Sequence, residues 1–125
     1  MPIERDTGMY PVMTTTCYCA AVRTAARKTT ALYDSLLEPA GVTLAQFSLL
    51  RKIKRAGTVS LTGLGRLAEL DRSTIGRNVK ALEKLRLVSM ALAEDHREAA
   101  VRLTPEGERA LRVGAPLWED RKSVV

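Results

Sequence analysis

The sequence predicts a mainly α-helical domain with a small β-hairpin, and three observations lead to this fold class. At 125 residues the chain is long enough for one hydrophobic core but not for two. Apolar residues make up 46% of it and charged residues 27%, as in an ordinary globular protein. Their spacing follows the helical period over most of the chain and changes to alternation only between residues 88 and 103.

The first predicted element is a long amphipathic helix over residues 16–37. Apolar side chains, Tyr18 and Val22 among them, recur along it at helical spacing. The run Glu38-Pro39-Ala40-Gly41 ends this helix, because proline disfavours helix at the preceding residue and glycine permits left-handed dihedral angles. Residues 1–15 contain two prolines and a glycine without periodicity, so we expect a flexible N-terminal arm there.

Two further helices are predicted between residues 43 and 68. Thr43 and Gln46 form a capping box that opens a helix running to about Ala56. A short extended stretch at residues 59–61 follows, and Thr62 is then expected to cap a small helix.

A fourth helix follows the tight turn at residues 69–71, with Asp71 or Ser73 as its cap. Its inward positions are spaced by four, three and three residues, and they are Ile75, Val79, Leu82 and Leu85.

The period changes after Arg86. Residues 88–92 and 100–103 alternate between apolar and small or polar side chains, and a short charged stretch at residues 94–98 joins them, which predicts a β-hairpin. Thr104 and Pro105 then begin a last helix, with threonine as cap and proline at the first position. Two short helices joined by a turn and followed by a hairpin make a winged helix-turn-helix, in which the second helix enters the major groove of DNA.

The charge pattern favours a nucleic-acid partner. The chain has a net charge of +6, and residues 51–86 alone hold ten basic residues against three acidic ones, a net charge of +7. A basic block in a folded segment indicates a polyanionic partner or an ordinary solvated helix face, and charge alone does not separate the two.

The exposed stripe of the fourth helix is better suited to DNA than to solvent alone. No acidic residue lies between Arg72 and Leu82. Arginine binds guanine O6 and N7 with two hydrogen bonds, and asparagine does the same for adenine N6 and N7. We therefore predict DNA contacts from one set of residues on this helix: Arg72, Ser73, Thr74, Arg77, Asn78 and Lys80.

The sequence also resembles the multiple-antibiotic-resistance regulator (MarR) family over about residues 17–117. The similarity is carried by Gln46-Phe47-Ser48-Leu49-Leu50, Leu70-Asp71-Arg72-Ser73-Thr74, Arg77-Asn78, Asp95-His96-Arg97 and Leu103-Thr104-Pro105-Glu106-Gly107. The resemblance implies a homodimeric winged-helix protein that binds double-stranded DNA at a pseudo-palindromic operator, usually as a repressor released by a small molecule or an oxidant. It also implies wing contacts from Arg97, beside Asp95, and we add His96 as a wing-tip contact to DNA or solvent.

This resemblance, together with the apolar faces at both ends of the chain, predicts how one domain is organised. Residues 16–38 and 105–125 are expected to be dimerisation helices around a DNA-binding lobe at residues 43–103. The predicted dimer anchors are Tyr18, Val22, Leu111, Leu117 and Trp118. By analogy with the family, an effector pocket would lie near Tyr18, Arg23, Arg27 and Phe47.

Three departures from the family pattern have physical consequences. Arg86 stands where the family has glycine after the recognition helix, which predicts a strained left-handed residue at a cost of ~1 kcal/mol. Gly63 and Gly65 stand where helix formers are usual and should weaken the small helix by ~1 kcal/mol each. The resemblance implies more dimerising helix after Trp118 than the sequence contains, so we expect a shortened interface.

Cys17 and Cys19 are the candidate redox residues. Two residues apart on a helix, their side chains point about 200° apart, so a bridge between them is not expected while the helix is intact. They are either one buried and one exposed structural thiol, or an oxidant sensor that bridges across a dimer. A metal site needs more donors than these thiols and His96 provide, so we predict neither metal nor cofactor.

No nucleophile motif, phosphate loop or pair of carboxylates at meaningful spacing is present, so we do not expect an enzyme. The alternative to a DNA-binding regulator is a winged helix used for protein interaction, or an anti-regulator that heterodimerises with a relative and does not bind DNA. The sequence has no run of about 20 apolar residues and no secretory signal pattern at its start, so we expect a cytoplasmic protein without membrane contact.

Overall fold

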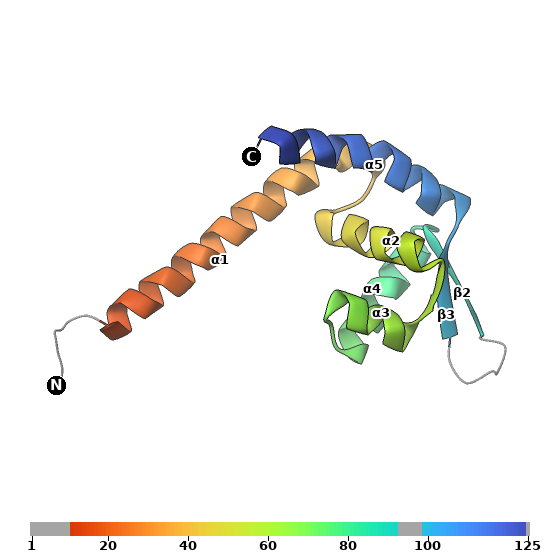
Figure 1. Cartoon of the computed structure of the whole chain (residues 1–125), viewed down its shortest axis with the longest axis horizontal. Coiled ribbons are helices and arrows are strands. Elements are labelled where there is room, and N and C mark those ends of the chain that lie inside the picture. The colour runs from red at the N-terminus through yellow and green to blue at the C-terminus, as the bar shows by residue number, and fades with distance from the viewer. Residues whose placement is uncertain (1–10, 93–98, 125) are drawn as a thin grey trace. The chain divides into compact units, whose positions relative to one another are not determined.

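The computed structural model describes residues 11–92 and 99–124 of the chain. These residues fall into two compact units, residues 1–33 and residues 34–125, and each is considered by itself. The first unit consists of helix α1 (Pro11–Leu36), whose last turn continues into the second. The second unit holds four further helices and a three-stranded sheet (Figure 1). This is the mainly helical fold with a small sheet that the sequence predicts.

Helix α1 begins five residues earlier than the apolar periodicity suggests. The predicted arm at residues 1–15 is therefore too long, because residues 11–15 are helical. Proline at the first helical position explains the start. Its fixed φ angle suits a helix, and an amide hydrogen at this position would have no partner within the helix, so its absence costs nothing. The 3-10 turn η1 (Glu38–Ala40) and Gly41, with φ of 77°, follow the end of α1, as the Glu38–Gly41 run predicts.

Helix α2 (Leu44–Ala56) opens with the predicted capping box. The Thr43 hydroxyl accepts a hydrogen bond from the Gln46 amide at 3.2 Å, and the Gln46 side chain accepts one from the Thr43 amide at 3.0 Å. The Asp34 carboxylate adds a partner by accepting from the Leu44 amide at 2.7 Å. Three of the free amides at the start of α2 are thus satisfied within the second unit.

Strand β1 (Thr58–Ser60) leads directly into helix α3 (Leu61–Ala68). The cap of α3 is Ser60, whose hydroxyl accepts from the Gly63 amide at 2.9 Å, so the prediction of Thr62 as cap is wrong by two residues. Ser60 has the extended backbone of a strand residue, which is also the conformation that an N-cap requires.

The sheet is antiparallel with strand order β1-β3-β2, and it confirms the predicted hairpin. Strands β2 (Val88–Leu92) and β3 (Ala99–Leu103) pair from Val88 opposite Leu103 to Leu92 opposite Ala99. Strand β1 pairs with the other edge of β3. Val88 and Val101 are buried, so one face of the sheet closes the core.

The core of the second unit is aliphatic around a single phenylalanine. Its fully buried side chains come from every layer: Phe47, Leu37, Leu50, Ile53, Leu64, Ile75, Leu82, Val79 and Val101. Helix α5 (Pro105–Val124) covers the core where Gly114 crosses the Phe47 ring. A Cβ atom on Gly114 would lie 2.7 Å from Phe47 Cε1, so the close approach of α5 requires glycine at this position.

Candidate nucleic-acid interface

Helix α4 (Arg72–Lys84) follows α3 through a turn of three residues. Glu69 adopts a left-handed conformation with φ of 57°, and the Leu70 amide returns to the Gly65 carbonyl at 2.9 Å. A Cβ atom on Gly65 would lie 3.0 Å from the Leu70 carbonyl oxygen. Gly65 therefore makes room for the turn, and its replacement by a better helix former would crowd the Leu70 carbonyl.

The buried face of α4 fixes the helix on the core. Ile75, Val79 and Leu82 have no exposed surface, as their spacing predicts. Leu85 does not continue this face, because it is 48% exposed. The helix ends at Lys84 and the chain turns, so the buried position passes to Leu87, which is 8% exposed.

The opposite face of α4 carries the predicted DNA-binding side chains to the surface. Five residues of this face are exposed: Arg72, Ser73, Arg77, Lys80 and Lys84. Thr74 and Asn78 are half-buried at its margin. The exposed face combines cations for phosphate with an arginine and an asparagine that can pair with base edges.

Neighbouring hydroxyl groups hold the two arginines near the start of α4. Arg72 Nη1 donates to Thr62 Oγ1 at 3.3 Å, which connects α4 to α3. Arg77 Nη2 donates to Thr74 Oγ1 at 3.4 Å, one turn back on the same helix. Both guanidinium groups thus have a hydroxyl partner beside them on the surface.

Asp71 occupies the N-cap position of α4 in extended conformation, although its side chain does not make a capping hydrogen bond to the helix amides. The hydroxyl of Thr74 chiefly lowers the pKa of the Asp71 carboxyl from its ordinary value of 3.8, and the nearby charge of Arg77 acts in the same direction. The carboxylate is therefore ionised at neutral pH and lies at the positive end of the helix dipole.

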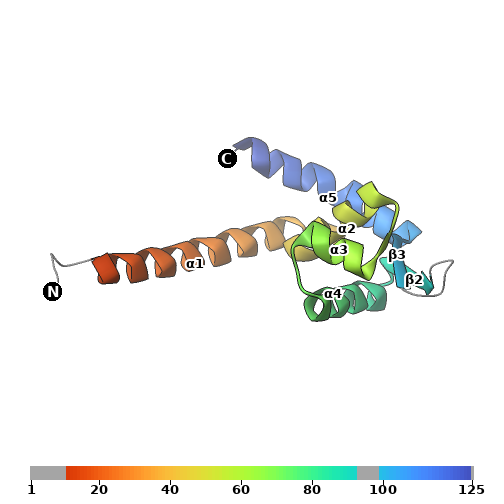
Figure 2. The same ribbon diagram turned by 60° about the horizontal axis from the view of Figure 1, so that its bottom comes forward.

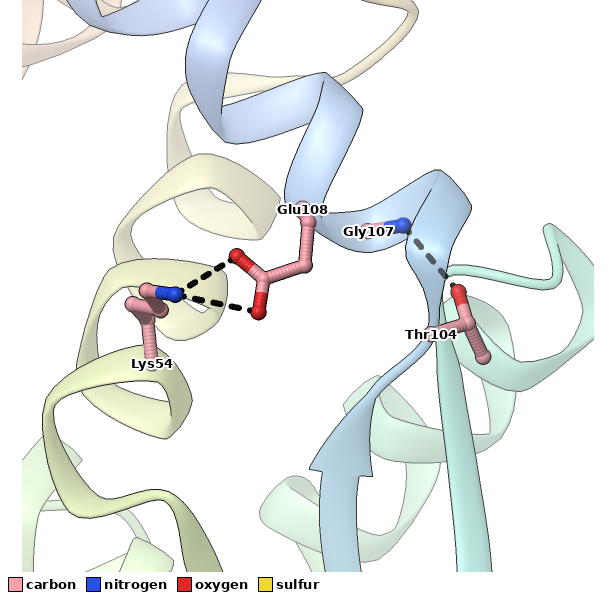
Figure 3. Close-up of polar contacts among 4 residues, drawn as sticks. All are labelled: Lys54, Thr104, Gly107 and Glu108. Atoms are coloured by element: carbon pink, nitrogen blue, oxygen red, sulfur yellow. Dashed lines mark hydrogen bonds and ion pairs between the residues drawn. The ribbon is translucent and has the colours of Figure 1, made fainter.

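The basic block at residues 51–86 is divided between two surfaces. The Arg51 guanidinium lies over the Trp118 ring, 4.6 Å from its centroid, and Lys54 Nζ lies 2.8 Å from Glu108 Oε1 (Figure 3). Both contacts join α2 to α5, whereas most of α4 lies on the other side of the second unit from α5 (Figures 1 and 2). The net charge of residues 51–86 therefore overstates what one DNA surface receives.

The predicted wing contacts His96 and Arg97, with Asp95, lie outside the described residues. The strands on either side of them pair in register up to Leu92 and Ala99.

The predicted dimer residues separate into two groups. Tyr18 and Val22 on α1 are 67% and 65% exposed. Leu111, Leu117 and Trp118 on α5 are half-buried, because they pack against the core of their own unit. The Trp118 and Phe47 ring centroids, for example, lie 6.4 Å apart, and the role of these three side chains as dimer anchors stays a prediction.

Cys17 and Cys19 are both exposed free thiols on α1, so the reading with one buried thiol is wrong. Over the described ranges, no three histidine, cysteine or acidic side chains lie close enough together to hold a metal ion. No helix in those ranges is both long enough and apolar enough to cross a membrane.

One junction was not anticipated from the sequence. The Thr104 hydroxyl accepts from the Gly107 amide at 3.0 Å, as the predicted cap of α5, but it also donates to the Arg86 carbonyl at 2.6 Å. Arg86 has the left-handed φ angle, 64°, that the missing glycine predicts. The hairpin that the sequence predicts could have indicated this junction. Pairing of Val88 with Leu103 brings the residues just before the one and just after the other together.

Comparisons with known proteins agree with this geometry. The model of the MarR family matches residues 40–98. The transcriptional regulator MosR of Mycobacterium tuberculosis, solved in complex with DNA, is 31% identical, with 84% of this chain and 77% of that chain covered and a TM-score of 0.76. MosR solved by itself is 30% identical, with coverage of 86% and 78% and a TM-score of 0.70.

More distant structures share the fold. A mutant of MarR from Escherichia coli, complexed with operator DNA, is 22% identical, with 78% of this chain and 71% of that chain covered and a TM-score of 0.72. Among curated proteins, none matches the sequence.

Proposed function

The chain belongs to the MarR family, and on this premise we propose that it is a sequence-specific DNA-binding transcription regulator whose helix α4 reads the major groove. The observation that carries the proposal is the division of α4 into two faces. Ile75, Val79 and Leu82 are fully buried, while the exposed face holds cations and no acidic residue before Glu83. The similarity to MosR, which was solved in complex with DNA, supports the same function.

The residues of α4 take different tasks in this proposal. Arg77 and Asn78, one turn into the helix, read base edges, whereas Ser73 and Thr74 contact the backbone or bases near the start of the helix. Lys80 and Lys84 neutralise phosphates, because they lie further along the helix as it leaves the groove. Arg72 adds positive charge while its hydrogen bond to Thr62 holds it toward α3.

The regulator acts as a homodimer on a pseudo-palindromic operator in this proposal. Exposed Tyr18 and Val22 on α1 support it, since apolar side chains one turn apart form a face that a second α1 can cover. Two recognition helices then meet half-sites one helical turn apart.

Release from the operator completes the proposed role of a repressor. Two features can receive a signal: the exposed thiols on α1, and a hollow of about 460 Å³ between α2 and α5. Phe47, Leu111 and Ala115 give the hollow an apolar lining, while Arg51, Lys54 and Arg55 supply positive charge.

Selection of bound duplexes from a random pool, followed by titration at fixed salt, tests the proposal. Arg77→Ala should weaken the selected site by ~1–3 kcal/mol and remove discrimination at one base position. Lys84→Ala should weaken all sequences alike and reduce the slope of log affinity against log salt by ~0.9. The matched control is Arg109→Ala, an exposed cation on α5 outside the proposed contact residues, which should change neither.

Two outcomes would contradict the proposal at different levels. If no duplex is enriched, the protein does not bind DNA, and a role in protein interaction or as an anti-regulator replaces the present one. If duplexes are enriched but Arg77→Ala keeps full affinity and selectivity, α4 is not the reading helix.

A further inference from the structure

The C-terminal end of α4 is closed by backbone hydrogen bonds around a left-handed arginine. The Arg86 amide donates to the Glu83 carbonyl at 2.9 Å, and the Leu87 amide donates to the Leu82 carbonyl at 3.0 Å. This pair of bonds is the Schellman closure, and the φ angle of 64° at Arg86 makes it possible. The closure leaves the Arg86 carbonyl free to accept a bond from elsewhere in the chain.

Thr104, the cap residue just before α5, supplies that bond. Its hydroxyl donates to the Arg86 carbonyl at 2.6 Å, and its amide donates to the Leu87 carbonyl at 3.1 Å. The same hydroxyl accepts from the Gly107 amide at 3.0 Å and so caps α5. A hydroxyl group has one hydrogen to donate, and Thr104 donates it to the Arg86 carbonyl at the end of α4.

The backbone of α5 lies directly against this closure. A Cβ atom on Gly107 would lie 2.1 Å from the Leu87 carbonyl oxygen, so only glycine fits between the two chain segments. Figure 3 shows Thr104 and Gly107 at the base of the hairpin, where β3 passes into α5. The end of α4 and the start of α5 are therefore held together by the Thr104 hydroxyl, the bond from the Thr104 amide to the Leu87 carbonyl, and the close contact at Gly107.

We propose that Thr104 is a positioning residue for DNA reading: by joining the closure of α4 to the first turn of α5, its hydroxyl sets the direction in which α4 is presented. The inference rests on the proposed function of α4. Thr104 touches no DNA in this proposal, and it acts on selectivity because base-edge hydrogen bonds tolerate less misplacement of a helix than phosphate contacts do.

The test separates the two tasks of the hydroxyl. In Thr104→Asp the carboxylate still accepts from the Gly107 amide, since aspartate is a good helix cap, but it has no hydrogen to donate to the Arg86 carbonyl. In Thr104→Ser both bonds remain. Affinity for the selected duplex and for a scrambled duplex is measured for both variants at one salt concentration, with thermal melting alongside.

We expect Thr104→Asp to lower the ratio of selected-site to scrambled-site affinity by about two- to tenfold, the factor that the loss of one ordinary hydrogen bond to a base edge represents. Thr104→Ser should keep the wild-type ratio, because both hydrogen bonds remain. A role as helix cap alone would leave both the melting temperature and this ratio near their wild-type values, because aspartate keeps the cap. An unchanged ratio in folded Thr104→Asp overturns the inference and leaves the proposed function intact.

Amide hydrogen exchange in the wild-type chain gives a second test that needs no variant. A shared hydroxyl couples the two helix ends, so the amides of Arg86, Leu87 and Gly107 should exchange with one opening equilibrium. Opening constants for Gly107 and Leu87 that differ by more than about tenfold would show that the ends open independently, and would overturn the inference. This result does not depend on DNA, so it stands even where the proposed function fails.

Discussion

Replacing Arg86 by glycine is expected to stabilise the protein although it removes a long side chain. Arg86 has a φ angle of 64° and its side chain is exposed. The left-handed conformation costs a residue with a Cβ atom ~1–2 kcal/mol, whereas glycine adopts it freely. Glycine also has greater conformational freedom in the unfolded chain, and this offsets ~0.5–1 kcal/mol of the stabilisation. The free energy of unfolding should therefore rise by roughly 0.5–1 kcal/mol, and the melting temperature by about 2–4 °C.

The assay is thermal unfolding of wild type and variants at one protein concentration, because association makes the melting temperature depend on concentration. Lys84→Gly is the matched control, since Lys84 is exposed two residues earlier, in the last turn of α4, and has a right-handed helical backbone. There the cost of glycine is unopposed, and stability should fall by ~1 kcal/mol. Glu69→Gly, at a φ angle of 57°, should behave as Arg86→Gly does. If Arg86→Gly melts no higher than wild type while Lys84→Gly falls as expected, the left-handed arginine is not strained.

Three further predictions concern packing, titration and assembly. Gly107→Ala should lower the free energy of unfolding in urea by ~1–3 kcal/mol, whereas Gly76→Ala, which meets nothing within 4 Å in its helix, should raise it by ~0.5–1 kcal/mol. Because the pKa of Asp71 is lowered in the folded state, its stabilising contribution is present above pH 3.8 and lost as the pH falls below it. The difference in melting temperature between wild type and Asp71→Asn should therefore shrink over that range. A difference that does not depend on pH would contradict this assignment. Tyr18→Asp with Val22→Asp should convert a dimer into a monomer in sedimentation, and a wild-type chain that is already monomeric at tens of micromolar would remove the proposed dimer.

The element order and most helix starts were predictable because local signals and the fold agree. The Thr43–Gln46 box, the alternation in β2 and β3 and the Thr104 cap each have one physical interpretation, and the structure adopts it. The prediction of Thr62 as the cap was wrong because the extended stretch ends at Ser60 and not at residue 61, and Ser60 is equally able to cap. The prediction that Leu85 points inward was wrong because helical spacing gives the direction of a side chain only within the helix, and α4 ends at Lys84.

The candidate site was predictable in its chemistry but not in its extent. The periodicity of Ile75, Val79 and Leu82 defines the opposite face of α4 with no further information. The sequence does not reveal that Arg51 lies over Trp118 or that Lys54 pairs with Glu108, because these contacts join segments more than fifty residues apart. Net charge along the chain is therefore a guide to the kind of partner and a poor guide to where the partner binds.

The way that α3 and α4 end has a consequence for how the recognition helix is placed. Both helices close with the same two backbone bonds around a left-handed residue that has a side chain, Glu69 in one case and Arg86 in the other. Left-handed glutamate and arginine are held there by their surroundings, since neither prefers that conformation. At the first closure Leu70 returns to Gly65, and at the second Thr104 holds the Arg86 carbonyl. In the proposed complex with DNA, the exposed side chains of α4 would decide which bases are read, while the contacts at its two ends would decide the angle from which they are read.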